Sequence, residues 1–225
     1  MANLGFQIHT EINRPDRALI EAFSGIPVAN IADNLNRICC VDSSIRPYNK
    51  APLLGCAFTV RATMGDNLLF HKALDMAKPG DVLVIAGGGT LKRSYCGAIM
   101  ASYAKSLGLA GFMIDGCIRD VEEIGKMDFP VYAKGVMPDG PYKNGPGEIN
   151  VPVSFAGQVI CPGDILVGDQ DGVVVIRPTE AEEVLEKAKK QLESENVTLA
   201  GIAAGKGLPR PWVEKLLSEK GVDII

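Results

Sequence analysis

An arginine and an aspartate stand side by side shortly after an apolar run. Residues 115–120 read Asp-Gly-Cys-Ile-Arg-Asp and directly follow residues 110–114, which are typical of a buried strand. The planar guanidinium of Arg119 suits a small carboxylate, and the carboxylate of Asp120 suits a hard divalent cation. On these six residues alone, an ordinary ion pair in a surface loop is an equally good interpretation.

The segment before this motif predicts the elements that would position it. A strand ends at three consecutive glycines, residues 87–89, and a helix is expected over 97–107. The apolar stripe expected on that helix consists of Ile99, Met100, Tyr103, Ala104 and Leu107. With the strand at 110–115 this makes a βαβ unit with a right-handed crossover. Ligands bind beyond the carboxyl ends of parallel strands, so the glycines, the helix start and the Arg-Asp pair should meet at one edge.

The rest of the chain indicates an α/β protein whose second half is mostly β. Helices are expected over 16–24, over 28–36 beginning near Pro27 or Asn30, and over 66–76. Strands are expected over 53–62, 129–133, 151–155 and 172–176. A charged helix over 180–195 and a last short helix around Trp212 should form a C-terminal helical tail.

One sequence pattern occurs twice. Residues 79–84 and 162–167 both begin Pro-Gly-Asp and continue into an apolar run. Proline followed by glycine fits the two central positions of a type II turn. Since neither copy adds a nucleophile or a set of metal ligands, we expect both to be structural turns that lead into buried strands.

Composition limits the class of protein. The 225 residues are enough for one domain plus a tail beginning near residue 180, and no linker divides them. The net charge is −4 with both signs scattered, which argues against nucleic-acid binding. No run of about 18 apolar residues and no signal peptide is present, so we expect a soluble cytoplasmic protein without a membrane partner.

Cysteine and histidine content excludes some sites. The six cysteines show no CxxC spacing and mostly lie in apolar runs, which favours reduced structural thiols. Only His9 and His71 are present, so a zinc site with several histidines is excluded and a Ser-His-Asp triad is disfavoured. Cys117 lies inside the motif, but only Arg119 is fixed beside it, so we do not expect covalent catalysis.

The order and spacing of several segments resemble the RraA-like family, which includes 4-hydroxy-4-methyl-2-oxoglutarate aldolases and regulators of ribonuclease activity. The resemblance extends from about residue 16 to about residue 220. The segments that carry it are Gly65-Asp66-Asn67 with His71, residues 78–84, residues 87–89, Gly111 with residues 115–120, and Pro162-Gly163-Asp164 with Asp171-Gly172-Val173.

This resemblance implies a fold, an assembly and a site. The implied fold is a compact β/β/α arrangement similar to the swivelling phosphohistidine domain, with a mixed sheet, in a homotrimer or a hexamer. Arg119 would bind a 2-oxo acid, and Asp120 would ligate Mg²⁺ or Mn²⁺. The backbone amides that would hold the substrate carboxylate are those of Gly97, Ala98, Ile99 and Met100. This agrees with the positive N-terminus of a helix.

The implied reaction is cleavage of a 4-hydroxy-2-oxo acid to pyruvate and a second oxo acid, or decarboxylation of oxaloacetate. The cation would stabilise the pyruvate enolate, and Arg119 would add a second positive charge. No lysine belongs to the motif, so a Schiff base is not proposed. Lys72 and Lys92 are more typical of solvated surface residues.

One departure bears on catalysis. Aldolase members of the family carry an acidic residue 21 positions before the arginine, where this chain has Ala98. Glu193 or Glu195 of a neighbouring subunit could replace that acid, although a solvated helix face is the more ordinary role for both. His71 and Asn67 could face the site, but a structural histidine is the more common case.

Two alternatives to the aldolase therefore stay open. One is a non-catalytic regulator that binds a ribonuclease, which Ala98 favours and the intact Arg119–Asp120 pair disfavours. The other is a 2-oxo acid lyase or binding protein of the same fold with a different substrate.

Overall fold

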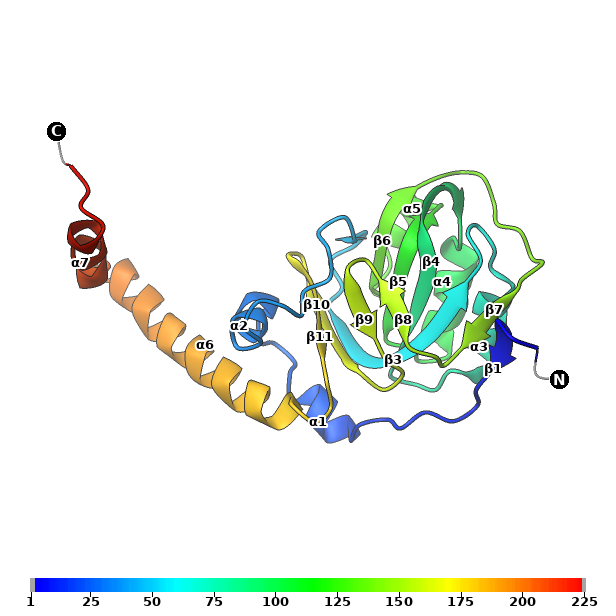
Figure 1. Ribbon diagram of the computed structural model, residues 1–225, viewed down its shortest axis with the longest axis horizontal. Helices are drawn as coiled ribbons and strands as arrows, with labels where there is room; N and C mark the ends of the chain where they lie inside the picture. The colour runs from blue at the N-terminus through cyan, green and yellow to red at the C-terminus, as the bar shows by residue number, and fades with distance from the viewer. Residues whose placement is uncertain (1–2, 224–225) are drawn as a thin grey trace. The chain divides into compact units, whose positions relative to one another are not determined.

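The computed structural model describes residues 3–223, and the chain divides after Ala188 into two compact units. The first unit is built on a mixed sheet with helices packed against it (Figure 1). This confirms the predicted α/β class with a mixed sheet and flanking helices. The single domain with a tail from about residue 180 stays a prediction.

Four parallel strands form the centre of the sheet. They are β3 (Leu53–Ala62), β4 (Asp81–Ser94), β5 (Gly111–Ile118) and β6 (Val131–Val136). The helices that connect them are α3 (Leu68–Met76), α4 (Ala98–Ser106) and α5 (Val121–Gly125). All eight residues of β5 are buried, as expected for a parallel strand covered on both faces. The predicted βαβ unit around α4 is thereby confirmed.

Shorter strands complete the sheet and its second layer. The edge strands are β1 (Phe6–Ile8) and β2 (Arg46–Pro47), and β7 (Gly147–Ile149) lies between β1 and β3. The hairpin of β10 (Ile165–Asp169) and β11 (Gly172–Ile176) pairs through β10 with the first half of β3, antiparallel to it. A separate hairpin joins β8 (Val153–Phe155) and β9 (Gln158–Ile160).

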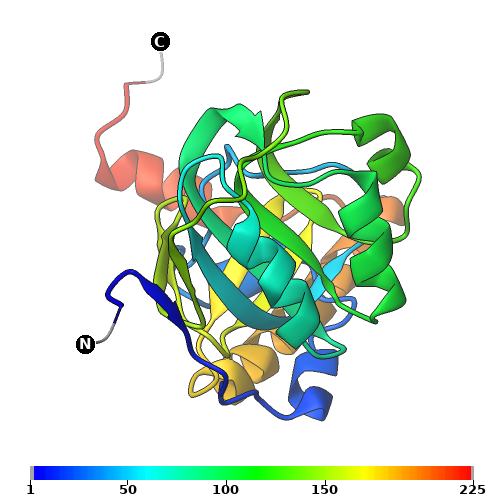
Figure 2. The same ribbon diagram turned by 90° about the vertical axis from the view of Figure 1, so that its right-hand side faces the viewer.

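Three apolar cores stack through the first unit. Helices α3, α4 and α5 cover one face of the sheet (Figure 2), and the two hairpins cover the other. Beyond the β10–β11 hairpin lie α1 (Arg17–Glu21), α2 (Val28–Asp33) and the first turns of α6 (Ala181–Ala203). Side chains of β11 alternate: Val173 and Val175 face the sheet, and Val174 and Ile176 face the helices.

Both repeated Pro-Gly-Asp segments are turns, as predicted. The glycines Gly80 and Gly163 have φ of 89° and 94°, which is the left-handed value that a type II turn requires. The backbone N–H of Asp81 donates to Lys78, and that of Asp164 donates to Cys161, which closes each turn.

Each turn also carries a buried carboxylate paired with an arginine. Arg14 binds Asp81 through two hydrogen bonds of 2.8 and 2.7 Å, and Arg177 binds Asp164 at 2.5 Å. Each aspartate also accepts the N–H of the residue three positions before it. Buried carboxylates are costly unless paired in this way, so the two arginines fasten both turns.

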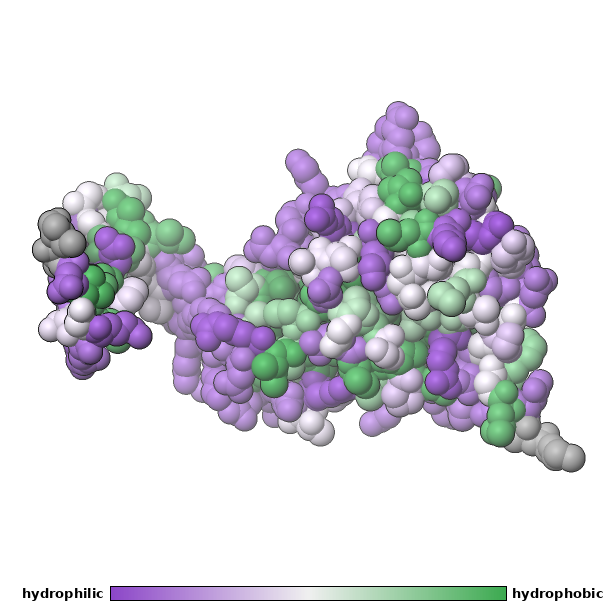
Figure 3. Space-filling view, turned by 45° about the horizontal axis from the view of Figure 1, so that its top comes forward, coloured by the Kyte–Doolittle hydropathy of each residue, from purple (hydrophilic) through white to green (hydrophobic). Residues whose placement is uncertain are grey.

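The second unit holds the end of α6 and α7 (Pro211–Glu219). The helix expected over 180–195 extends to Ala203, and the short helix around Trp212 is confirmed. Apolar side chains are visible on the surface of this unit at the left of Figure 3. The exposed ones are Val197, Leu199, Ile202, Leu208, Trp212, Leu216 and Val222. Within residues 3–223, no helix has both the length and the apolarity needed to span a membrane.

A buried tyrosine joins β4 and β5 to the loop before α3. The Tyr95 ring is fully buried, and a Cβ placed on Gly87 or on Gly116 would overlap it. Its hydroxyl donates to the Gly87 carbonyl and accepts the Gly65 N–H, both at 2.8 Å. Burial raises the pKa of Tyr95 to about 12. Two glycines are therefore required because the ring occupies the space of their side chains.

Replacing Gly116 by alanine should destabilise the first unit. The added methyl group meets the Tyr95 ring, and overpacking of this kind costs about 1–3 kcal/mol in free energy of unfolding. Gly125→Ala is the matched control, because its Cβ would meet only the Tyr48 carbonyl oxygen at 3.7 Å and alanine favours helix. Urea denaturation of both variants measures the difference, and equal stability would contradict this account.

Candidate functional site

The Asp-Gly-Cys-Ile-Arg-Asp motif straddles the end of β5. Residues 115–118 still belong to the strand, because Cys117 pairs with Ser94 and Gly135 beyond irregularities in the register. The expectation that the whole motif follows the strand is therefore wrong. Only Arg119 and Asp120 leave the sheet, at the carboxyl end of the parallel strands where a ligand site was predicted.

Asp115 lies within β5 and forms its ion pair with Lys134 of β6 rather than with Arg119. Its carboxylate is almost completely buried, and Lys134 Nζ lies 3.5 Å from Oδ1 without a hydrogen bond. The first aspartate of the motif is thus in a different environment from the last. We assign Asp115 to the ion pair with β6.

The three glycines do not form a separate loop. Strand β4 continues through them to Ser94, with a register irregularity between Ile85 and Thr90. Gly88 and Gly89 have φ of 69° and 71°, so the strand bends there rather than ending. The expectation that the strand ends at residues 87–89 is therefore wrong, because backbone pairing with β5 resumes after the bend.

Asp120 lies at the N-terminus of α4. One of its carboxylate oxygens accepts the Ala98 N–H at 3.0 Å, and a Cβ on Gly97 would overlap that oxygen. The backbone of Asp120 itself is left-handed, with φ of 58°, a conformation that aspartate tolerates. The unpaired amides at the start of α4 therefore already attract an anionic group in this structure.

Arg119 lies beside the same helix start. Its backbone N–H donates to the Cys96 carbonyl at 3.0 Å, and its Nε is 4.0 Å from an Asp120 oxygen. Its side chain is 47% exposed. Arg119, Asp120 and the amide of Ala98 are thus brought together, as predicted. Ile99 and Met100 follow in the first turn of α4.

A segment that sequence reasoning missed borders Arg119. A Cβ on Gly140 would lie 3.2 Å from Arg119 Nη1, so this backbone is directly against the guanidinium. Arg93 and Ser94, at the end of β4, bind the same segment: Ser94 donates to Asp139 O, and Arg93 donates to Gly140 O. The polar run that ends β4 was the only sequence signal for this contact.

Asp66 and Asn67 are structural rather than open to a ligand. The Asp66 carboxylate accepts the N–H groups of Leu68, Asn144 and Gly145. Asn67 is buried and donates to the Tyr95 carbonyl at 2.8 Å. The Gly65-Asp66-Asn67 segment thus fixes the start of α3.

Helices α3 and α4 enclose a hollow of about 460 Å³ next to the site. His71 lines it together with Ile99, Met100 and Tyr103. The predicted apolar stripe of α4 is partly wrong: Ile99 is 84% and Tyr103 is 49% exposed, while the fully buried residues are Ala101 and Ala104. Alanines on the buried face let α4 pack close to the sheet.

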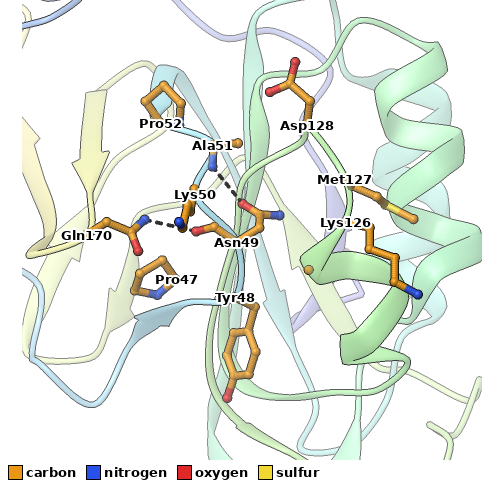
Figure 4. Close-up of a pocket in the computed structure, with 11 residues that line it drawn as sticks. Pro47, Tyr48, Asn49, Lys50, Ala51, Pro52, Lys126, Met127, Asp128 and Gln170 are labelled. Carbon is orange, nitrogen blue, oxygen red and sulfur yellow. Dashed lines mark hydrogen bonds between the residues drawn. The ribbon is translucent and has the colours of Figure 1, made fainter.

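Another hollow, of about 750 Å³, lies at the amino ends of the parallel strands, away from Arg119 (Figure 4). Its Asn49 side chain donates to the carbonyls of Ile124 and Phe129 and accepts the Ala51 N–H. Gln170 donates to the Asn49 carbonyl. These side chains serve the fold, so we do not assign a site there.

The cysteines of the site region are not activated. All six cysteines are free, and burial raises the pKa of the Cys117 thiol and of the neighbouring Cys96 thiol. Burial also raises the pKa of Cys56 to about 12. These thiols are therefore protonated at neutral pH, as expected for structural cysteines.

A divalent cation such as Mg²⁺ needs several oxygen ligands. Among the residues described, no group of three or more His, Cys, Asp or Glu side chains is placed to hold a metal ion. Asp120 supplies one carboxylate, which is 45% exposed and lies 4.0 Å from Arg119 Nε. Mg²⁺ commonly takes one or two protein carboxylates and completes its shell with water and substrate oxygens. The residues fit a cation shared with a chelating substrate.

A sequence model of the RraA-like family, described as Aldolase/RraA, matches residues 28–175. A protein of Halalkalibacterium halodurans, provisionally named 4-hydroxy-4-methyl-2-oxoglutarate aldolase, is 39% identical over 199 residues, which cover 88% of this chain and 95% of that protein.

Solved structures agree with the fold. The RNA-processing inhibitor RraA from Thermus thermophilis is 28% identical with a TM-score of 0.62, covering 67% of this chain and 92% of that one. A Pseudomonas syringae protein at 24% identity has a TM-score of 0.77 and covers 86% of this chain and 96% of that one.

His71 should titrate below its ordinary range. Burial lowers the pKa of His71 from 6.5, and the charge of Lys143 lowers it further. Folding therefore favours the neutral imidazole, and the stability that this contributes above pH 6.5 is lost as pH falls toward the folded pKa. NMR titration is clean because the only other histidine is His9. We expect Lys143→Ala to raise the pKa and Lys92→Ala to leave it unchanged; a wild-type value above 6.5 would contradict this.

Proposed function

Because this chain belongs to the RraA-like family, we propose that it is a divalent-metal-dependent carbon–carbon lyase acting on 2-oxo acids. The proposed reaction is the cleavage of 4-hydroxy-4-methyl-2-oxoglutarate-type substrates to pyruvate, with decarboxylation of oxaloacetate at the same site. The observation that carries this proposal is that Arg119 and Asp120 lie together at the amide end of α4.

Each group has a chemical task in this proposal. Arg119 binds the substrate carboxylate through its guanidinium fork, and the amides from Gly97 to Met100 complete an anion site at the start of α4. Asp120 holds Mg²⁺ or Mn²⁺. When bound, the cation supplies positive charge for the negative charge that develops on the 2-oxo oxygen.

Asp120 and the substrate carboxylate compete for one donor. The Asp120 carboxylate occupies the Ala98 N–H, so it must leave that amide before a substrate carboxylate can bind there. Gly97 makes either arrangement possible, because it leaves room beside the amide. The same carboxylate thus both closes the helix end and serves as the proposed cation ligand.

Ala98 affects the two proposed reactions differently. Its methyl group supplies no acid or base, whereas cleavage of a 4-hydroxy acid requires removal of the hydroxyl proton. Decarboxylation of oxaloacetate releases CO₂ without that proton transfer. We therefore propose that oxaloacetate decarboxylation is the better retained reaction, and that Glu193 or Glu195 of another subunit is the source of any replacement acid.

A coupled pyruvate assay tests the assignment. With Mg²⁺ or Mn²⁺ we expect pyruvate from oxaloacetate, and EDTA should abolish its release. Asp120→Ala and Arg119→Ala should each lower kcat/KM by at least about 100-fold, because each removes a charge that stabilises the transition state. Glu122→Ala, a nearby exposed carboxylate that pairs with Lys126, is the matched control. Unchanged turnover in Asp120→Ala would refute its assignment as the cation ligand.

We also propose that the chain forms a homo-oligomer, a trimer or a hexamer, in the cytoplasm, without a nucleic-acid or membrane partner. The exposed apolar residues of the second unit support self-association, since patches of this kind commonly mark protein contacts. Light scattering after size-exclusion chromatography measures the assembly, and a monomer at micromolar concentration would contradict it.

A second candidate function is a regulator that binds a ribonuclease. Ala98 favours it, because the position carries no acid, and one structural relative is an RNA-processing inhibitor. The intact Arg119–Asp120 arrangement favours the enzyme. A pull-down with a purified RNA-processing endonuclease that recovers no complex would remove the regulator from consideration.

A further inference from the structure

We propose that Arg93 is a positioning residue for Arg119. It holds residues 139–142 against the Arg119 guanidinium and thereby sets how tightly a 2-oxo acid binds. This inference rests on the proposed function of Arg119, but part of its test does not depend on turnover.

Arg93 binds the segment through both terminal nitrogens of its guanidinium. Its Nη1 donates to the Gly140 carbonyl and its Nη2 donates to the Tyr142 hydroxyl, both at 2.8 Å. The guanidinium carbon also lies 4.0 Å from the centre of the Tyr142 ring. A fork that binds two acceptors while stacking on an aromatic ring is specific to arginine.

The opposite end of Arg93 is equally constrained. A Cβ on Gly65 would lie 3.0 Å from the Arg93 Cδ, so the stem of Arg93 packs directly on that glycine. The backbone of Tyr142 bonds to Gly65 and to Asn67 at 2.8 and 3.0 Å. Arg93 therefore lies between two segments that also bind each other, and it has little freedom to move.

Residues 139–142 limit the space available to the Arg119 side chain, and we call this segment the Arg119 wall. Gly140 contributes its backbone to Arg93 on one side, and its Cα faces Arg119 Nη1 on the other. A long side chain that is half exposed loses binding strength when it is free to sample many rotamers. Displacing the Arg119 wall should weaken binding of the 2-oxo acid equally in the ground state and the transition state. The KM then rises with little change in kcat.

Lys143 directly follows residues 139–142. The charge of Lys143 acts on the imidazole, while Asp75 and Lys72 belong to the helix of His71 itself. A displaced segment would take Lys143 with it. The pKa of His71, measured without substrate, therefore reports whether the Arg119 wall has moved.

The kinetic test compares Arg93→Ala, Arg93→Lys and Tyr142→Phe with Lys92→Ala, an exposed neighbour on the same strand. For Arg93→Ala we expect about a tenfold increase in the KM for oxaloacetate, and a similar increase in the Kd for oxalate with Mg²⁺, with kcat within about threefold. The KM and Kd values of Arg93→Lys and Tyr142→Phe should lie between those of Arg93→Ala and the wild type. Lys92→Ala should match the wild type.

The second readout is the NMR titration of His71 in the same variants. Arg93→Ala should raise the pKa of His71 in the direction of Lys143→Ala, and Lys92→Ala should not. Wild-type KM, oxalate affinity and His71 titration in Arg93→Ala would overturn the proposal, as would a loss of kcat with unchanged KM. If Arg93→Ala does not fold, wild-type values in both conservative variants overturn it.

The two proposals fail separately. If the wild-type protein releases no pyruvate, the proposed function fails, while oxalate affinity and the titration of His71 still decide the role of Arg93. If pyruvate is released but Arg93→Ala behaves like the wild type, only the positioning role is lost.

Discussion

The carboxyl edge of the sheet depends on one buried side chain, Tyr95. Its ring replaces the side chains that Gly87 and Gly116 lack, and its hydroxyl bridges Gly65 to Gly87. Through these contacts two neighbouring strands and the loop before α3 have fixed relative positions. Cys96, the residue directly after Tyr95, accepts the Arg119 N–H through its backbone carbonyl. Tyr95 therefore also fixes the backbone beside the candidate site.

The site combines rigid backbone with exposed charge. The amides of α4 and the backbone around Gly140 are set by the fold, whereas the Arg119 and Asp120 side chains are about half exposed. Such a division is common in ligand sites, where regular elements position a few polar groups. It also agrees with the absence of a complete cation site among residues 3–223: under the proposed function, the protein supplies donors for an anion, and water and the bound molecule supply most of the cation ligands.

Sequence patterns predicted the strands and turns that depend on local sequence. They failed where the pairing of neighbouring strands determines the backbone conformation. The strand over 53–62 and the two Pro-Gly-Asp turns were predicted within a residue, because burial and turn geometry leave a direct signal. The bend in β4 at the glycines was not predicted, because a register irregularity depends on the pairing of two strands. The location of Arg119 and Asp120 beyond the end of β5 was predicted from residue type and position, and their roles stay a proposal. Arg93 was missed because its partners lie about 50 residues away along the chain.

The two arginine–aspartate pairs determine where this chain can be shortened. Arg14 and Arg177 both lie outside residues 28–175, the span that the family model matches, while Asp81 and Asp164 lie inside it. A fragment cut to that span would keep both buried carboxylates and lose both of their counter-charges, which is strongly destabilising. In this chain, the residues that stabilise the buried charges therefore extend beyond the span that the family model matches, on both sides of it.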